Sequence, residues 1–595
     1  MKRIALIVLC CWAAHACGQE LPVQKLSFDG NSFRSAGQLR KLMRLRWPGG
    51  RFDRDSLKKG LDRLAAYYAG QGFVDFRSEY LVTQDTARAA AEITVYLSEG
   101  SRYLISSVQF TGNERVAGDQ LGKAIRARRG APYDASALGQ DDFNLMMLYA
   151  DYGLIYAEVD HQVEVGENRD VRIAFRVNEG DPVRIGRIAV AGNRFVKTAA
   201  VMRELSLREG TLFSRMELAK SQAQLMATGL FKEAVVVPGA LSPDSGIIDL
   251  DVQLRERPRH RLEAGIGYGS GDALRVTSNW SNRDLDGWGK SLEFSGQLAF
   301  QLWSQVKLVR GLVQAGYRDP WFLGRHRPTL VNLYYDDVRP AYTDYRLQTV
   351  GALIRTNLNT GRFVNTAVTW KQEWLKLSPG WNRPGNVADT LGYRGHRSVA
   401  LSADFERTLD PVNPIQGVRG GIEAEYSGGL LGGINTLQRL NATAIVLGGP
   451  RSLPLMFGAR LRLGIVGDWS RQYAVPVYEK FVLGGPATLR GFPLGMAGPL
   501  DSQGRPAGGD KMALLNLETK VRLYRNWRAV LFGDAGFVSD RSFNKVSLRE
   551  AVGNPGVGLR YVLPIGSARL DLAAPWAQAG LIRKWRVVVA WGEAF

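Results

Sequence analysis

Arg490 is the residue of this chain whose surroundings most clearly demand a chemical partner. It lies in a glycine-rich apolar stretch that runs from Phe481 to Phe492 and ends in Leu489-Arg490-Gly491-Phe492. Because a guanidinium stays charged and carries five hydrogen-bond donors, it needs acceptors wherever the stretch packs. The stretch is therefore predicted to be a loop that brings its backbone close to a wall, with a partner for Arg490 on that wall.

Catalytic and metal-binding patterns are sparse. Beyond the first residues the histidines are widely scattered, without a paired-histidine metal motif, and no Gly-x-Ser-x-Gly nucleophile elbow occurs. Cys10, Cys11 and Cys17 are the only cysteines, so a disulfide framework, a cysteine nucleophile and a thiolate metal site are excluded within one chain. No cofactor and no metal are expected, and an enzyme is disfavoured.

The N-terminus reads as an export signal. Lys2 and Arg3 precede an apolar run that is too short to span a bilayer, and the small residues of Ala14-His15-Ala16 follow it. Residues 1–18 are predicted to be a signal peptide. Plain cleavage is favoured, and lipid modification of Cys17 is the open alternative.

The chain is basic, with 77 Lys and Arg against 57 Asp and Glu, a net charge of +20 that becomes +18 without Lys2 and Arg3. Nucleic acid is an unsuitable partner for an exported chain without any nucleic-acid-binding motif. Anionic lipids and lipopolysaccharide phosphates are the expected neighbours of this charge.

The elements that come first form a threefold repeat. Phe28-Asp29-Gly30-Asn31 recurs as Phe110-Thr111-Gly112-Asn113 and as Val190-Ala191-Gly192-Asn193. A second marker, a large residue followed four positions later by Gly and another large residue, keeps the same phase. Each unit is predicted to read strand, helix, helix, strand, strand, over residues 20–100, 101–181 and 182–257. The repeated glycines are interpreted as turn and cap residues that report the fold.

Helix signals support this order. In the first unit the second helix is predicted to begin near Asp53, to bury Leu57, Leu61, Leu64 and Tyr68, and to end at Gly70 or Gly72. In the third unit Ser214 and Glu217 fit a capping box.

From 258 to 595 the sequence alternates with period two. Between Ala513 and Tyr524 the odd positions are largely apolar, whereas the even positions include Asn516, Glu518 and Lys520. Such alternation is typical of a strand with one apolar and one polar face. A soluble sandwich also alternates, but the export signal, the Trp and Tyr near strand ends and the terminal Phe595 favour a membrane barrel.

The expected fold class is therefore α+β repeats followed by an all-β transmembrane antiparallel barrel of sixteen strands, which allows about 21 residues for each strand and its connection. Closure of this barrel is required, because an open edge in lipid leaves backbone groups unsatisfied.

Four motifs make a family resemblance specific. They are Asn282-Arg283-Asp284-Leu285-Asp286-Gly287-Trp288-Gly289, Asp319-Pro320-Trp321-Phe322-Leu323-Gly324, Asp410-Pro411-Val412-Asn413-Pro414 and the Leu489-Arg490-Gly491-Phe492 loop. They resemble the barrel of the outer-membrane assembly and translocation family that includes BamA and TamA, and the repeats before it resemble polypeptide-transport-associated (POTRA) domains. Three repeats are closest in layout to TamA.

The resemblance implies that the Arg490 loop folds into the barrel and pairs with acidic residues on the inner wall, which by motif are Glu518 and Asp534. Taken alone these two carboxylates look like a general acid/base pair, but an adjacent arginine makes them structural partners. The resemblance also implies a lateral seam between the first and last strands, and a C-terminal insertion signal at Phe595. The seam residues are Leu262, Gly265, Gly267, Gly269, Val587, Val589 and Trp591.

The function implied is assembly, insertion or translocation of outer-membrane proteins, autotransporter assembly included. The repeats would capture unfolded clients in the periplasm, and the seam would template their insertion. A lipoprotein or inner-membrane partner through the repeats is the further expectation. The alternatives are a two-partner-type secretion pore, a passive outer-membrane channel and, least favoured, a barrel hydrolase.

Overall fold

The computed structural model describes residues 22–592 except 46–51, 86–89, 240–245, 270–272, 302–305, 341–344, 362, 380–391, 410–415, 451–453, 469–473, 541–549, 564–565, 578–579 and 582–584. The predicted signal peptide and Phe595 lie outside the described residues. None of the helices in the described part of the chain combines the length and the hydropathy needed to cross a bilayer.

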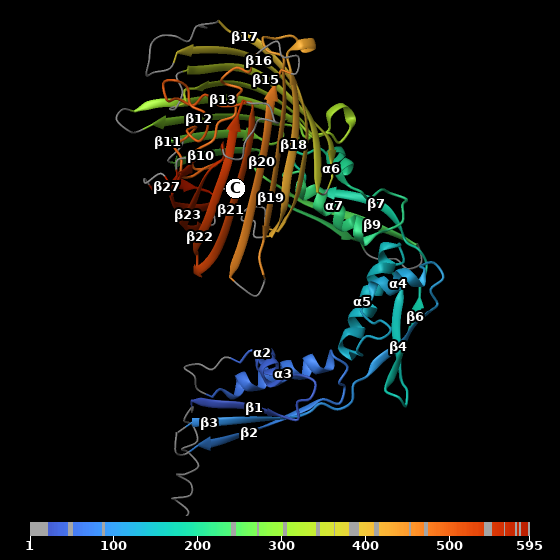
Figure 1. Cartoon of the computed structure of the whole chain (residues 1–595). Coiled ribbons are helices and arrows are strands. Elements are labelled where there is room, and N and C mark those ends of the chain that lie inside the picture. The colour runs from blue at the N-terminus through green and yellow to red at the C-terminus, as the bar shows by residue number, and fades with distance from the viewer. Residues whose placement is uncertain are drawn as a thin grey trace, which may run out of the picture. The chain divides into compact units, whose positions relative to one another are not determined.

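The three repeats have the predicted element order (Figure 1). The first contains β1 (Val23–Asp29), α2 (Ala36–Met43), α3 (Arg54–Ala69), β2 (Arg77–Asp85) and β3 (Ala90–Ser98). The second contains β4 (Leu104–Thr111), α4 (Gly118–Ala124), α5 (Ala135–Asp151), β5 (Glu158–Val165) and β6 (Asp170–Asn178). The third contains β7 (Arg184–Ala191), α6 (Thr198–Glu204), α7 (Arg215–Ala227), β8 (Phe231–Pro238) and β9 (Ile247–Glu256). In each sheet the last strand is central, as in the order β1-β3-β2.

The repeated glycine is a fold residue, as predicted. Gly30, Gly112 and Gly192 have φ values of 78°, 82° and 86°. A Cβ at these positions would lie 2.0 to 2.1 Å from the carbonyl oxygen of Leu97, Val177 or Leu254. Both the positive φ and the close backbone approach therefore require glycine here.

A carboxylate that the sequence reading did not single out closes the same turn in all three repeats. Glu99 accepts hydrogen bonds from the Ser32 and Phe33 amides at 3.0 to 3.1 Å and from the Tyr68 hydroxyl at 2.7 Å. Glu179 and Glu256 accept from the corresponding amides of the second and third turns. The turn amides, which have no strand partner, are thereby satisfied.

The predicted helix signals are formed in large part. The α3 helix begins after the N-cap Asp53, ends at Gly70 and buries its predicted apolar stripe. In the third repeat only half of the capping box is present. The Glu217 amide donates to the Ser214 hydroxyl at 3.3 Å, but the Glu217 carboxylate pairs with Lys220 instead of returning to Ser214.

The remainder is one antiparallel sheet of sixteen long strands and a two-strand hairpin. The strands up to the seventh are β10 (His260–Gly269), β11 (Ala273–Asn282), β12 (Ser291–Gln301), β13 (Lys307–Asp319), β14 (Thr329–Val338), β15 (Tyr345–Thr360) and β16 (Val364–Pro379). The next six are β17 (Arg394–Leu409), β18 (Gln416–Ser427), β19 (Leu437–Gly448), β20 (Leu455–Gly467), β21 (Lys511–Tyr524) and β22 (Trp527–Ser539). The last are β23 (Val552–Leu563), β24 (Gly566–Ala573), the short β25 (Trp576–Ala577) and β26 (Gly580–Leu581), and β27 (Arg586–Trp591).

The alternation along these strands separates an outer and an inner face, as predicted. On β21 the outer Leu515 and Leu517 are exposed, whereas the inner Asn516 and Glu518 are buried. On β22 the outer Leu531 is exposed and the inner Asp534 is buried. The outer face is the apolar surface that lipid requires, and the polar groups point inward.

Closure departs from the expectation at one place, the seam between β10 and β27. The two strands are neighbours in the barrel, yet no backbone ladder joins their described residues, and the sheet order runs from β10 to β27 without returning. Over its described residues the barrel is thus nearly closed. At the seam the facing edges of the described parts of β10 and β27 therefore have no hydrogen-bonded strand neighbour.

Candidate functional site

The loop between β20 and β21 carries Arg490 into a buried position. Leu489 and Phe492, on either side of it, are buried in a cluster with Leu483, Ala497, Met512, Leu514 and Val538. Gly484 and Gly485 turn the chain with φ values of 117° and 99°, and the Gly485 amide donates to the carbonyls of Leu489 and Phe492. The apolar residues of the motif thus bury the loop, and only Arg490 brings charge into it.

Arg490 binds both acidic residues that the sequence reading assigned to it. Its Nε and Nη2 donate to the two oxygens of Asp534 at 2.9 and 2.7 Å, and its Nη1 donates to Glu518 Oε1 at 2.5 Å. The guanidinium carbon lies 3.5 Å from the centroid of the Phe532 ring. Arg490 is 1% exposed, so this is a desolvated fork contact.

Two asparagines, which the sequence reading missed, orient Asp534. Asn516 Nδ2 donates to Asp534 Oδ1 at 2.7 Å and to the Thr488 carbonyl at 2.7 Å. Asn554 Nδ2 donates to Asp534 Oδ2 at 2.8 Å, while its Oδ1 accepts from the Gly491 amide at 2.9 Å. A Cβ at Gly491 would lie 2.7 Å from the Asn554 Cβ, so only glycine fits between the arginine and the wall.

Two arginines of the wall hold the tip of the loop from either side. Arg569 Nη2 donates to the Pro486 carbonyl at 2.7 Å, and Arg460 Nη2 donates to the next carbonyl, that of Ala487. Arg460 also donates to Asn516 Oδ1 through Nε at 3.0 Å. The tip is therefore fixed through its backbone, which explains why its sequence carries no recognisable partner.

A third carboxylate completes the network. Asp571 is fully buried, accepts from Arg560 Nη1 and lies 3.7 Å from Arg490 Nη1. Glu518 is shared among Arg490, Arg560 at 3.5 Å and Lys520 at 3.3 Å. Leaving any of these charges alone in such a buried place is costly, so the network holds together as a unit.

The predicted seam residues occupy the two facing strands but lie apart from the loop network. On β10, Leu262 is exposed on the outer face and Gly267 has open space where a Cβ would stand. A Cβ at Gly265 would lie 2.8 Å from Thr277 Oγ1 on β11, and Gly269 ends the strand. On β27 the outer residues Val587, Val589 and Trp591 are all exposed.

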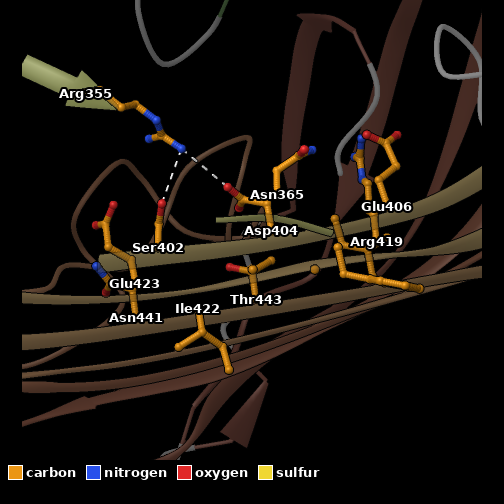
Figure 2. A pocket seen from close by; sticks show the side chains of 14 residues that line it. Arg355, Asn365, Ser402, Asp404, Glu406, Arg419, Ile422, Glu423, Asn441 and Thr443 are labelled. Atoms are coloured by element: carbon orange, nitrogen blue, oxygen red, sulfur yellow. Dashed lines mark hydrogen bonds and ion pairs between the residues drawn. The ribbon is translucent and has the colours of Figure 1, made fainter. Parts of the chain in front are cut away.

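A second polar region lies on the inner wall away from the loop. Residues from β15 to β19 line a recess of about 500 Å³. Arg355 Nη2 lies 3.3 Å from Ser402 Oγ and 3.5 Å from Asp404 Oδ2. In Figure 2 the Arg355 side chain points toward both of these residues. Arg419 and Glu406 also line it and stand opposite each other in the β17–β18 register. In this recess both arginines therefore face carboxylates.

Both parts of the chain match known protein families. Residues 284–581 match the Omp85 superfamily domain, and residues 22–100, 103–180 and 183–257 match POTRA, the surface antigen variable number repeat. The chain belongs to the Omp85 superfamily. Its barrel lies in the bacterial outer membrane, and its POTRA repeats lie in the periplasm.

Two curated relatives that cover most of the chain carry the same name. The chain is 24% identical over 572 residues to "Outer membrane protein assembly factor BamA" of Neisseria meningitidis, covering 88% of this chain and 69% of the relative. It is 23% identical to the protein of the same name from Nitratidesulfovibrio vulgaris, covering 94% of this chain and 71% of the relative. The resemblance to the family is confirmed, whereas the closer likeness to TamA stays a prediction.

A solved structure agrees with the fold. The crystal structure of BamA from Haemophilus ducreyi lacking POTRA domains 1–3 superposes with a TM-score of 0.63 at 19% identity, over 82% of this chain and 99% of that one. This likeness supports the fold of the repeats and the fold of the barrel.

Proposed function

We propose that this chain inserts unfolded barrel proteins into the outer membrane. The observation that carries the proposal is the seam, where the described residues of β10 and β27 are neighbours without a backbone ladder. The names of the curated relatives, outer membrane protein assembly factors, support the same activity.

The seam offers a physical route for insertion. Strand edges in lipid have unsatisfied N–H and C=O groups, and an incoming strand satisfies them by main-chain hydrogen bonds. The glycines of β10 at positions 265, 267 and 269 leave its edge with few side chains to exclude such a strand. A client strand that pairs with β10 here would already have the orientation of a membrane-spanning strand before it is released from this edge.

The POTRA repeats would hold clients before insertion. In each three-stranded sheet β2, β5 or β8 is an edge strand, and exposed apolar residues such as Leu81, Val165 and Val237 lie on these strands. An extended client can add to such an edge through backbone hydrogen bonds, with little demand on its sequence. A lipoprotein or inner-membrane partner would bind through the same repeats.

The test is a reversible lock across the seam. In a Cys17→Ser background, Gly267→Cys and Ala590→Cys are joined by a cleavable bifunctional thiol reagent, because both positions border the groove at the seam. The purified chain in liposomes is then given an unfolded barrel client. The lock is expected to abolish accelerated insertion, and cleavage of the reagent is expected to restore it.

A matched lock on a paired interface controls for the reagent. Gly265 and Thr277 are cross-strand partners in the β10–β11 register, and joining cysteines there leaves the seam untouched. Insertion is expected to continue with this control. Equal insertion by the seam-locked and unlocked chains would rule out the proposal.

The alternative functions, a passive channel, a secretion pore and a hydrolase, predict different results in the same liposome assay. A passive channel would conduct freely without accelerating insertion, but the Arg490 loop and its network occupy part of the lumen, which disfavours steady conduction. A two-partner secretion pore would move its client across the membrane and not into it. The hydrolase is disfavoured because Glu518 and Asp534 are both held by Arg490.

A further inference from the structure

Four arginines stand in one row across adjacent strands of the inner wall. In the ladder registers Arg522 of β21 faces Arg528 of β22, Arg528 faces Arg560 of β23, and Arg560 faces Arg569 of β24. All four have the same parity along their strands as the inward Glu518, Asp534, Asn554 and Asp571, so they share the lumen face. Exposure falls along the row, from the exposed Arg522 and half-buried Arg528 to the buried Arg560 and Arg569.

The row has fewer carboxylates than its charge requires. Like charges directly opposite each other destabilise a sheet. Elsewhere on the inner wall Arg310 pairs with Asp336 at 2.8 Å and Arg355 pairs with Asp404 at 3.5 Å. Within the row Asp571 serves Arg560, but no carboxylate of the described chain pairs with Arg522 or Arg528.

The buried arginines of the row also have hydrogen-bond donors without an acceptor. The buried N–H groups without an acceptor are Arg528 Nη1, Arg560 Nε, and Arg569 Nε and Nη1, the last of which is 3.8 Å from Asp571. Buried donors of charged groups are normally satisfied. A row that holds two unpaired cations, Arg522 and Arg528, together with spare donors is therefore suited to an oxyanion with several acceptor oxygens.

The other face of the same strands carries an apolar groove. Trp527, Tyr561 and Leu570, each adjacent in sequence to one arginine of the row, line a groove of about 630 Å³ at the seam, and Arg569 of the row lines it as well. Ile266, Tyr268 and Trp591 line it from the seam strands, and the Trp527 and Tyr561 rings lie 4.8 Å apart.

The row and the groove meet at one rim. At the β21–β22 turn of Arg525 and Asn526 the sheet ends, three residues after Arg522 and two residues before Arg528. This turn is periplasmic, because β10 follows directly on the periplasmic repeats and the strands then alternate in direction. Aromatic and basic residues at such a rim are typical of the membrane interface.

We propose that the arginine row binds the phosphate of an anionic membrane lipid whose acyl chain lies in the groove. The guanidinium forks of Arg522 and Arg528 match the phosphate oxygens, and the apolar groove takes a flexible chain. Net negative charge is required of the headgroup, because a zwitterionic lipid brings its own cation to the row. The proposal depends only on the outer-membrane location and not on the assembly function.

The test measures lipid binding by the purified full chain in nonionic detergent. Short-chain phosphatidylglycerol, short-chain phosphatidylcholine with the same acyl chains, and inorganic phosphate are titrated separately, and bound molecules are counted by native mass spectrometry. Phosphatidylglycerol is expected to bind more tightly than phosphatidylcholine, and added salt is expected to reduce the difference. Arg528→Gln is expected to weaken phosphatidylglycerol binding about fivefold, the effect of one Arg at an anionic surface.

Arg419→Gln is the matched control. Arg419 is also a half-buried lumen arginine without an ion pair to a described residue, but it faces Glu406 across the ladder, and its loss is expected to leave binding unchanged. Arg528→Lys is expected to retain part of the binding. Heat-modifiable migration verifies that each variant folds, and the wild-type lipid preference tests the proposal without any variant.

The remaining outcomes discriminate between ligands. Equal binding of the two lipids, or an equal loss in Arg419→Gln and Arg528→Gln, would overturn the proposal. If inorganic phosphate binds as tightly as the lipid, the ligand of the row is a free anion and not a lipid. If an acidic unfolded client binds through Arg528 and the lipid does not bind, the ligand of the row is the client. Failure of client insertion leaves each of these results unaffected.

Discussion

Arg490 and Asp534 meet through two parallel hydrogen bonds, Nε to Oδ2 at 2.9 Å and Nη2 to Oδ1 at 2.7 Å, and the Arg490 amide donates to the same carboxylate at 3.2 Å. Residue 490 is thus fixed by backbone and side chain together. The contact joins a loop to β22 across 44 residues of sequence, so it reports the position of the whole loop.

Arg490→Ala is expected to destabilise the folded barrel by about 3–5 kcal/mol, because Asp534 and Glu518 would remain buried without their partner. Arg490→Lys keeps the charge but cannot bind two oxygens in parallel, so we expect an intermediate loss. Heat-modifiable migration and client insertion are the measurements. Arg419→Ala, which removes a lumen arginine outside the network, is the control. Wild-type behaviour of Arg490→Ala in both assays would contradict the assigned role.

Arg460→Gln is expected to loosen the tip of the loop while leaving the barrel folded. Charge-assisted hydrogen bonds contribute about 1.5–3 kcal/mol, so amide exchange at Arg490 and Gly491 should become about ten- to a hundredfold faster. Hydrogen exchange followed by mass spectrometry measures it. Arg462→Gln, on the same face of β20, should leave the exchange unchanged. Unaltered protection in Arg460→Gln would mean that the Ala487 contact is dispensable.

Gly112→Ala is expected to destabilise the second repeat by about 1–3 kcal/mol at least, because its φ of 82° and the Val177 carbonyl at 2.1 Å exclude a Cβ. Gly139→Ala, in the middle of α5 with no atom within 4 Å of the new methyl, is expected to stabilise the same repeat by up to about 1 kcal/mol. Hydrogen exchange of second-repeat amides in the full chain compares them. Equal effects would refute the steric argument.

The first repeat is expected to lose stability as the pH falls. Burial alone would raise the pKa of Glu99, but hydrogen bonds from Ser32, Tyr68 and Phe33 outweigh it and hold this pKa below its usual range. A depressed folded-state pKa contributes stability above the unfolded pKa, and that stability is lost as pH falls through the folded value. The protection factors of the Ser32 and Phe33 amides, which are their exchange rates relative to the intrinsic rate at the same pH, should therefore fall in acid.

Glu99→Gln isolates this contribution. The variant is expected to be less stable at neutral pH by about 1–3 kcal/mol, since a neutral amide replaces a charged acceptor. It should also lose the acid dependence of exchange at Ser32 and Phe33, while the second repeat, capped by Glu179, keeps its own behaviour. The same acid dependence in Glu99→Gln and wild type would exclude Glu99 as its source.

The architecture was predictable because its signals are local and periodic. The glycine turns recur in phase, and alternation places Glu518 and Asp534 on the inner face. The partners of Asp534 were not predictable, because they depend on strand register. Asn554 lies in Gly553-Asn554-Pro555-Gly556, which looks like a turn, yet it sits within β23 directly opposite Asp534. Arg460 and Arg569 bind backbone carbonyls, which leave no trace in the side-chain pattern of the loop.

The loop network is fastened to one side of the seam only. Arg490, Arg460 and Arg569 tie the loop to strands between β20 and β24, which precede β27 in the wall, whereas the described residues of β10 have their ladder with β11 alone. The wall is therefore mechanically asymmetric. When the seam widens, β10 and its neighbours should move as a hinge, whereas the strands from β20 to β24, which the loop network holds together, should stay in place. The strand that moves is therefore the glycine-rich one.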